Sequence, residues 1–300
     1  MTLPFQISST ILYTSNRRSM RVLEFVGASL VIYNNTGLAL SIFTGCSQVC
    51  LLHVCQPCVP EGFEEELMRR QDTNRNPVGG TVPVSAPLRS PVFVNTDIES
   101  SSALWALAPD DVMQQSIDIH DRIMRSAIAT HRGYEVTTRG DSFEVVFHSI
   151  KSAIAFCIDV QLQLLVAPWP HQLHGIVPAT IKKRVMHRTV FRGLRVRMGV
   201  HDACEAEGRL VVHPHTVTGR ATYTGTSEVI AEDVGELGHG GQIVVTKRVA
   251  DWLEDCASQL DVDISVKRMG QLSIRHVGDG ASPIEVFDVL PLILIGRRKL

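Results

Sequence analysis

The strongest constraint on the fold of this chain comes from two aspartates, each expected where a β-strand ends or turns. Residues 92–94 predict a short buried strand that runs to Asp97. Strands at 134–138 and 143–147 flank the Gly140-Asp141 turn, which is typical of a β-hairpin. Two carboxylates delivered by adjacent strands make a site of hard oxygen ligands for Mg²⁺ or Mn²⁺, the ions that handle triphosphates. The pair therefore indicates nucleotide chemistry.

The rest of the pattern predicts an α+β fold. Pro109 begins a helix that ends before Gly133, and Ser149 can cap a second helix. Later elements are a helix at 227–237 and strands at 194–200, 242–245, 271–274 and 284–289. This order of strands and helices predicts a ferredoxin-like antiparallel sheet with helices packed on it.

Turn-forming residues at 71–90 predict a linker and so divide the chain. We expect an irregular N-terminal extension, linker included, at 1–88, a folded domain at 89–292 and a basic tail at 293–300. Inside the domain, the long connector 166–193 contains prolines and the basic run 182–184. This run could contact phosphate, but a solvated insertion is the favoured expectation.

Charge and cysteine content exclude some classes of protein. The 300-residue chain has a net charge of −2, so it has no overall basic field that would recruit nucleic acid. Its seven cysteines are odd in number and unevenly spread, unlike a secreted disulfide framework. A reducing compartment is therefore expected for the folded domain.

A long uncharged segment lies near the N-terminus. Residues 25–60 contain no Asp, Glu, Lys or Arg, and 37–54 approach the length of a membrane span. Polar residues such as Asn34 and Gln48 are ones that a strong span would avoid. Two interpretations stay open: a membrane-associated segment at about 26–54 with the folded domain cytoplasmic, or a poorly folded or membrane-surface extension of a cytoplasmic protein.

Four cysteines crowd that segment, at Cys46, Cys50, Cys55 and Cys58. With His53 among them they are a zinc candidate, but their spacing matches no common zinc finger. Small apolar residues, or acylation sites beside a membrane, are the alternatives.

Four ordered strings, at 96–105, 134–143, 193–201 and 240–243, resemble the class III adenylate and guanylate cyclase catalytic domain. The chain is most similar in these strings to the trypanosomatid receptor-type and fungal adenylate cyclases, and the likeness covers about residues 90–291. Four motifs in order are far more specific than a lone Gly-Asp hairpin. The resemblance implies a ferredoxin-like domain that dimerises head to tail, with active sites at the subunit interface.

The resemblance also implies a metal site. Asp97 and Asp141 match the family's two metal-binding aspartates, and the Ile98 carbonyl matches a further ligand. Two ions, Mg²⁺ or Mn²⁺, would lower the pKa of the ribose 3′-hydroxyl and neutralise the triphosphate during in-line attack that releases pyrophosphate. The alternative is a hairpin-turn aspartate and a helix-side aspartate that hold no metal.

The other half of the family's site departs from the pattern. Thr137 stands at the position of the adenine-reading lysine, and Thr222 at that of a second purine-reading residue. Val229 and Asp233 occupy the positions of the transition-state asparagine and arginine, so no catalytic residue of that pair is intact. No lysine occurs between Asp97 and Ile150, and no asparagine follows Asn95. A carboxylate at the arginine position would repel developing phosphate charge, and loss of one such donor costs about 10²–10³ in rate.

One family cation on the phosphate side has a counterpart here. Arg275 matches it, although an exposed arginine at a strand edge is the alternative interpretation. Ala203 is a further departure, since the family usually has glycine there.

These matches predict a metal-donating half of a heterodimer. The expected reaction is ATP to cyclic AMP plus pyrophosphate, in cyclic-nucleotide signalling, with a complementary cyclase subunit as partner and close to no activity as a homodimer. An alternative is a catalytically inactive pseudocyclase that acts as a regulatory or dimerisation module. A third option is a site in which Thr137 and Thr222 read a different base. No nucleic-acid partner is expected, and association with a membrane is left open.

Overall fold

The computed structural model divides the chain into two compact units, Met1–Cys58 and Val59–Leu300. It describes residues 22–26, 29–33, 84–214, 220–273 and 283–300. In the first unit, β1 (Val22–Val26) pairs antiparallel with β2 (Ser29–Tyr33).

Most of the expected membrane-associated segment, 26–54, lies outside the described residues, as does the whole cluster of Cys46, Cys50, Cys55 and Cys58. Among the helices that the structure describes, none combines the length and the apolar character needed to cross a bilayer.

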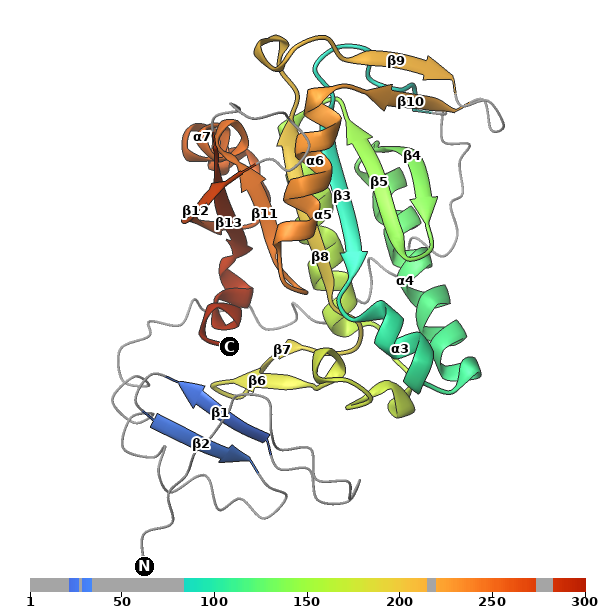
Figure 1. Cartoon of the computed structure of the whole chain (residues 1–300), viewed down its shortest axis with the longest axis vertical. Coiled ribbons are helices and arrows are strands. Elements are labelled where there is room, and N and C mark those ends of the chain that lie inside the picture. Colours follow the sequence, from blue (N-terminus) through green and yellow to red (C-terminus); the bar gives the residue numbers. More distant parts are fainter. Residues whose placement is uncertain (1–21, 27–28, 34–83, 215–219, 274–282) are drawn as a thin grey trace, which may run out of the picture. The chain divides into compact units, whose positions relative to one another are not determined.

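The second unit contains the predicted α+β domain (Figure 1). Its helices and strands follow one another as β3 (Val92–Ile98), α3 (Ser101–Leu107), α4 (Asp110–Thr130), β4 (Tyr134–Arg139), β5 (Ser142–Phe147), α5 (Ile150–Val166), β6 (Lys183–Val185), β7 (Arg188–Phe191), β8 (Val196–Asp202), β9 (Val211–Pro214), β10 (Ala221–Thr224), α6 (Thr226–Leu237), β11 (Ile243–Thr246), α7 (Lys247–Cys256), β12 (Ile264–Leu272) and β13 (Ile284–Pro291). Short 3₁₀ turns lie at His171–Leu173, Pro178–Thr180, Glu205–Glu207, Ala257–Gln259 and Leu292–Lys299.

A seven-stranded sheet in the order β12-β13-β11-β8-β3-β5-β4 organises the domain. All neighbouring strands are antiparallel except β8 and β11, which pair in parallel, so the sheet is mixed rather than wholly antiparallel. Helix α6 covers one face, and α4 and α5 cover the other (Figure 1). The predicted fold of a sheet with helices packed on it is confirmed.

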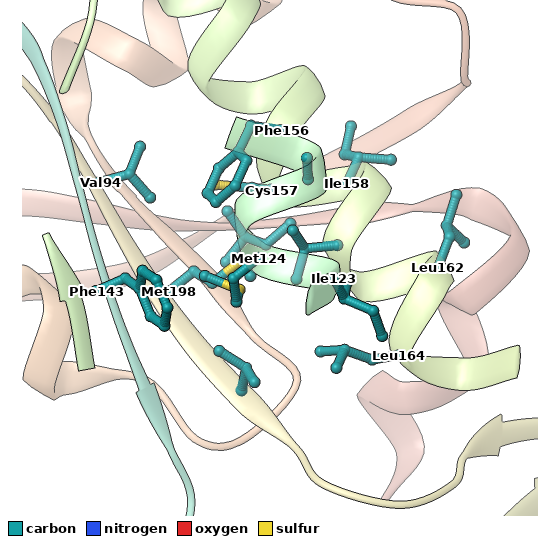
Figure 2. Close-up of a cluster of buried hydrophobic side chains, with 14 of the residues drawn as sticks. Val94, Ile123, Met124, Phe143, Phe156, Cys157, Ile158, Leu162, Leu164 and Met198 are labelled. Carbon is teal, nitrogen blue, oxygen red and sulfur yellow. The ribbon is translucent and has the colours of Figure 1, made fainter. Parts of the chain in front are cut away.

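Strand alternation supplies apolar side chains to both faces of the sheet. Val94 of β3 packs in the cluster that contains α4 and α5, whereas its neighbour Phe93 packs with Ala231 of α6. Figure 2 shows side chains of α4 and α5, such as Met124 and Phe156, directed toward β3, β5 and β8. The central strands are therefore covered on both faces, and functional groups must come from strand ends and turns.

Local sequence signals set the N-terminal ends of α4 and α5. Pro109 caps α4, and Asp110 and Asp111 lie in its first turn, where the positive end of the helix dipole favours acidic side chains. The Ser149 hydroxyl accepts a hydrogen bond of 3.2 Å from the Ser152 amide and so caps α5, as predicted.

The connector between α5 and β8 is packed against the core, so the prediction of a solvated insertion is wrong. Trp169, Leu173 and Val190 are buried, and the Trp169 indole donates to the Leu164 carbonyl at 2.8 Å. Gly193, with φ of +72°, leaves room for that indole. The segment contributes isolated large apolar residues rather than a periodic stripe, so its burial carries no periodic signal in the sequence.

Residues 293–300, expected as a basic tail, also pack on the domain. All but Leu300 belong to the turn Leu292–Lys299, in which Leu294 is buried. Arg298 donates to the Asp288 carboxylate at 2.8 Å and to the Ser265 hydroxyl at 2.7 Å, which ties the turn to β12 and β13.

Candidate active site

The two aspartates singled out in the sequence meet at one end of the sheet. Antiparallel pairing of β3 with β5 brings the β4–β5 turn beside the end of β3. The Ile98 amide donates to Asp141 Oδ2 at 3.2 Å, and the Ser142 hydroxyl donates to Asp97 Oδ1 at 2.8 Å. Hydrogen bonds thus link the end of β3 to the β4–β5 turn in both directions and hold the two carboxylates at this end of the sheet.

Arg197 on β8 completes this cluster and was given no role by sequence reasoning. Its Nε and Nη2 atoms lie 2.9 and 2.5 Å from Asp97 Oδ2, and its Nη1 donates to the Glu236 carbonyl at 3.1 Å. Asp97 and Arg197 are register partners in the antiparallel pair of β3 and β8. The alternation of residues 194–200 was the available signal, because it sets Arg195 and Arg197 on one face of that strand.

The oxygen atoms of this cluster fit a divalent cation of the hard type. Two carboxylates and the Ile98 carbonyl are the donors that Mg²⁺ and Mn²⁺ prefer. Each carboxylate has lone pairs beyond the hydrogen bonds described above. Within the described ranges there is no group of three or more His, Cys, Asp or Glu side chains arranged to hold a metal.

A cavity of about 220 Å³ opens beside Asp97 between the sheet and α6. It is lined by Asn95, Thr96, Asp97, Thr137, Arg139, Ser142, Phe143, Glu144, Arg197, Glu228, Glu232, Gly235 and Glu236. Asp97 and Thr137, which the sequence assigned to metal and base, therefore share one cavity. Thr222 lies outside its lining, on β10, where the side chain donates to the His213 carbonyl at 2.9 Å.

Helix α6 presents carboxylates to this cavity. Glu228, Glu232 and Glu236 line it, whereas Asp233 is 2 % exposed and Val229 is half-buried, and neither belongs to the lining. The positions named from the family pattern thus lie beside the cavity-facing row of α6 and not on it. Arg275 lies outside the described residues.

Burial makes two carboxyl groups in the cavity lining, Glu144 and Glu228, harder to ionise. Burial raises the pKa of Glu144 to about 7, and repulsion by Glu228 and Glu232 acts in the same direction against the attraction of Arg139. Burial and then the charge of Glu232 raise the pKa of Glu228 as well. Glu144 is therefore partly protonated near neutral pH. The glutamates of α6 that line the cavity would repel an anion when they are deprotonated.

The free energy of unfolding of the domain should depend on whether Glu144 is protonated. Its pKa rises from 4.5 to about 7 on folding, so the stabilisation linked to that proton is complete below pH 4.5 and is lost as the pH rises through 7. Glu144→Gln removes this loss, and it should raise the free energy of unfolding at pH 8 by ~2–3 kcal/mol with little effect at pH 4.5. Urea unfolding at both pH values measures the difference. Glu254→Gln, at an exposed position of α7, is the matched control, and the same pH response in both variants would contradict the assignment.

His201, the last residue of the 193–201 string, has a structural role. His201 Nε2 lies 3.0 Å from Glu207 Oε2, which also accepts the Ser227 hydroxyl at 2.6 Å. Burial opposes ionisation of Glu207, but these hydrogen bonds and the charge of His201 outweigh it and lower the pKa to about 2. The network joins β8 to the first turn of α6 and so helps to place the helix beside the cavity.

Comparison with known proteins gives consistent matches. The family model described as Adenylate and Guanylate cyclase catalytic domain matches residues 90–287. The adenylate cyclase of Lachancea kluyveri is 36% identical over 184 residues, which are 61% of this chain and 9% of that protein. The receptor-type adenylate cyclase GRESAG 4.1 of Trypanosoma brucei brucei is 28% identical over 265 residues, which are 82% of this chain and 20% of that protein.

Solved structures agree. An adenylate cyclase from Trypanosoma brucei in its monomeric state aligns with a TM-score of 0.58 and 27% identity, covering 69% of this chain and 91% of that one. The chain spans only 9% and 11% of the length of two fungal adenylate cyclases that it matches.

Proposed function

Since the chain belongs to the adenylate and guanylate cyclase catalytic domain family, we propose that it forms cyclic AMP and pyrophosphate from ATP as the metal-donating half of a heterodimer. The observation that carries the proposal is the convergence of Asp97 and Asp141 around Ile98, next to a cavity whose α6 wall is acidic. ATP is the proposed substrate because the fungal and trypanosomal relatives are named adenylate cyclases.

The chain's own residues have distinct parts in this proposal. Asp97, Asp141 and the Ile98 carbonyl would hold two Mg²⁺ or Mn²⁺ ions. When bound, these ions would acidify the ribose 3′-hydroxyl and neutralise the triphosphate. Ser142 and Arg197 orient the Asp97 carboxylate through the hydrogen bonds at 2.8 and 2.9 Å.

The base-reading half is proposed to come from the partner. Thr137 is uncharged, and the cavity-facing row of α6 carries Glu228 and Glu232 in place of any cation. A triphosphate next to these carboxylates is repelled unless they are protonated. Two copies of this chain would repeat the defect at both sites, so we expect a homodimer to form cyclic AMP very slowly.

A complementation assay tests the proposal. The full chain is mixed with a cyclase domain that carries the family's base-reading and transition-state residues but whose own metal aspartates are replaced by asparagine. Each protein alone should form no detectable cyclic AMP from Mn²⁺-ATP. The mixture should form cyclic AMP, because one complete site is then assembled. If mixtures over a range of ratios of the two proteins form no cyclic AMP, the heterodimer proposal is wrong.

The acidic face of α6 favours one second candidate, a pseudocyclase that binds a partner without turnover. Calorimetry with Mn²⁺-ATP separates the two candidates. Binding without product in any mixture supports a regulatory module, and no binding at all supports a module for dimerisation only. Membrane association of residues 26–54 stays a prediction.

A further inference from the structure

A second and larger cavity, of about 690 Å³, lies away from the Asp97 cavity in the same unit. Its walls come from the residue after β3, the β6–β7 hairpin, the residues before β8 and β11, strands β12 and β13, and the C-terminal turn. Six basic side chains line it: Lys183, Arg195, Lys267, Arg268, Arg297 and Arg298. The carboxylates in the lining are Glu99 and Asp288.

In the lining of this cavity, the guanidinium groups of Arg195 and Arg297 stack on one aromatic ring, that of Phe191. The Cζ atoms of Arg195 and Arg297 lie 4.1 and 4.5 Å from the centroid of the Phe191 ring. Such stacking holds guanidinium planes in place while their edges stay available for hydrogen bonds. Gly241 leaves the space that this arrangement needs, since a Cβ there would lie 2.4 Å from the Phe191 ring and 3.2 Å from Arg297 Nη1.

In the described part of the chain, the hydrogen-bond acceptors of Arg297 are all neutral groups. It donates to the Val190 carbonyl at 2.8 Å, the Gly241 carbonyl at 2.9 Å and Gln161 Oε1 at 2.6 Å. These bonds fix the guanidinium without neutralising it. Burial, and then the charge of Arg195, lower the pKa of Arg297, which means that the cation is destabilised where it lies.

Arg195 is also incompletely paired. Its Nη2 donates to the Ile181 carbonyl at 3.0 Å, and its Nη1 lies 3.8 Å from Glu99 Oε2, beyond hydrogen-bond distance. Arg195 Nε and Glu99 Oε2 are buried, and neither has a hydrogen-bond partner in the described part of the chain. A buried cation that is incompletely paired is destabilised, so an anion bound beside Arg195 would be favourable.

The charges around the cavity do not balance. Arg298 pairs with Asp288 at 2.8 Å, and Arg268 pairs with Glu285. No carboxylate lies within ion-pair distance of Lys183 or Lys267 in the ranges that the structure describes. With Glu285 included, six cations face three carboxylates, which leaves three positive charges in excess.

We propose that this cavity is an anion site, separate from the Asp97 cavity, that binds a compact polyphosphate-bearing molecule. Arg195 and Arg297 contact the phosphate groups through the guanidinium N–H groups that their hydrogen bonds to the protein leave over. Lys183 and Lys267 supply charge at the rim. The volume exceeds what one phosphate needs and lies in the range of small-molecule pockets, so at least two linked phosphates are expected.

The test uses inorganic pyrophosphate and the full chain in EDTA, so that metal-dependent binding at Asp97 cannot contribute. Isothermal calorimetry should detect binding that weakens with salt. Lys183→Glu and Lys267→Glu, at partly or fully exposed positions, should each weaken it about tenfold, because a charge at the rim is reversed.

Two matched charge reversals serve as controls. Arg184→Glu changes the exposed neighbour of Lys183 that does not line the cavity, and Arg139→Glu changes the rim of the Asp97 cavity. Both should bind pyrophosphate within about twofold of the original chain. Absence of binding, binding unaffected by both lysine reversals, or an equal loss in either control would overturn the proposal. Thermal unfolding of each variant establishes that it is folded before binding is compared.

Discussion

Asp97→Asn is expected to abolish cyclic AMP formation in the complementation mixture, with a loss of about 10²–10³-fold or more. Asparagine keeps the shape of the side chain and one oxygen acceptor. It removes the negative charge that would hold a divalent cation and that pairs with Arg197 at 2.9 Å. The domain should stay folded, because this ion pair is partly exposed and such pairs contribute little to stability.

Asp111→Asn is the matched control for this effect. Asp111 is exposed in the first turn of α4 and does not line the cavity. Its replacement should leave the rate of the mixture within about twofold, since loss of a charge near a helix terminus changes stability by well under 1–2 kcal/mol. A mixture in which Asp97→Asn is as active as the original chain would contradict the metal-donating role of this subunit.

Gly199→Ala should destabilise the domain by about 3 kcal/mol or more, because an added methyl group has no space. A Cβ at this position of β8 would lie 2.3 Å from the Gly235 nitrogen and 2.6 Å from the Val234 carbonyl carbon. These atoms belong to the backbone of α6, so they cannot move away as a side chain can. The whole helix must shift, together with Glu228 and Glu232, or the domain must unfold.

Denaturant unfolding compares this variant with Gly175→Ala. Gly175 has φ of +79° and no atom near its Cβ position, so alanine there costs only the backbone strain of about 1–2 kcal/mol. Equal losses in the two variants would show that β8 and α6 are not in close contact. The same shift of α6 should also lower the affinity of the Asp97 cavity for any nucleotide.

Sequence patterns predicted most of the domain because its elements carry local signals. The Gly140-Asp141 turn, the Ser149 cap and the strand at β8 are each set by neighbours in the chain, and the structure confirms them. The alternation at 194–200 predicted a half-buried strand, and this was wrong, because β8 lies in the middle of the sheet and is buried at nearly every position. The convergence of Asp97 and Asp141 was also predictable, since paired strands bring their ends together. Their role as metal ligands stays a prediction.

Two features escaped that reasoning. The connector 166–193 packs through Trp169 and Leu173, which have no periodic spacing. Arg197 pairs with Asp97 only because β3 and β8 are adjacent and antiparallel, and strand adjacency is a property of the sheet.

The sequence alone determined which chemical groups exist: two aspartates at strand ends, and no lysine between Asp97 and Ile150 to read a base. An absence of this kind holds for any fold. Only the tertiary structure decided how those groups behave, because burial and electrostatic interaction depend on distance in space. It buries Glu144 and brings Glu228 and Glu232 close to it, and so raises the pKa of Glu144 to about 7. It likewise brings Arg195 to Arg297 around Phe191, and so builds a cationic cavity from segments far apart in the chain.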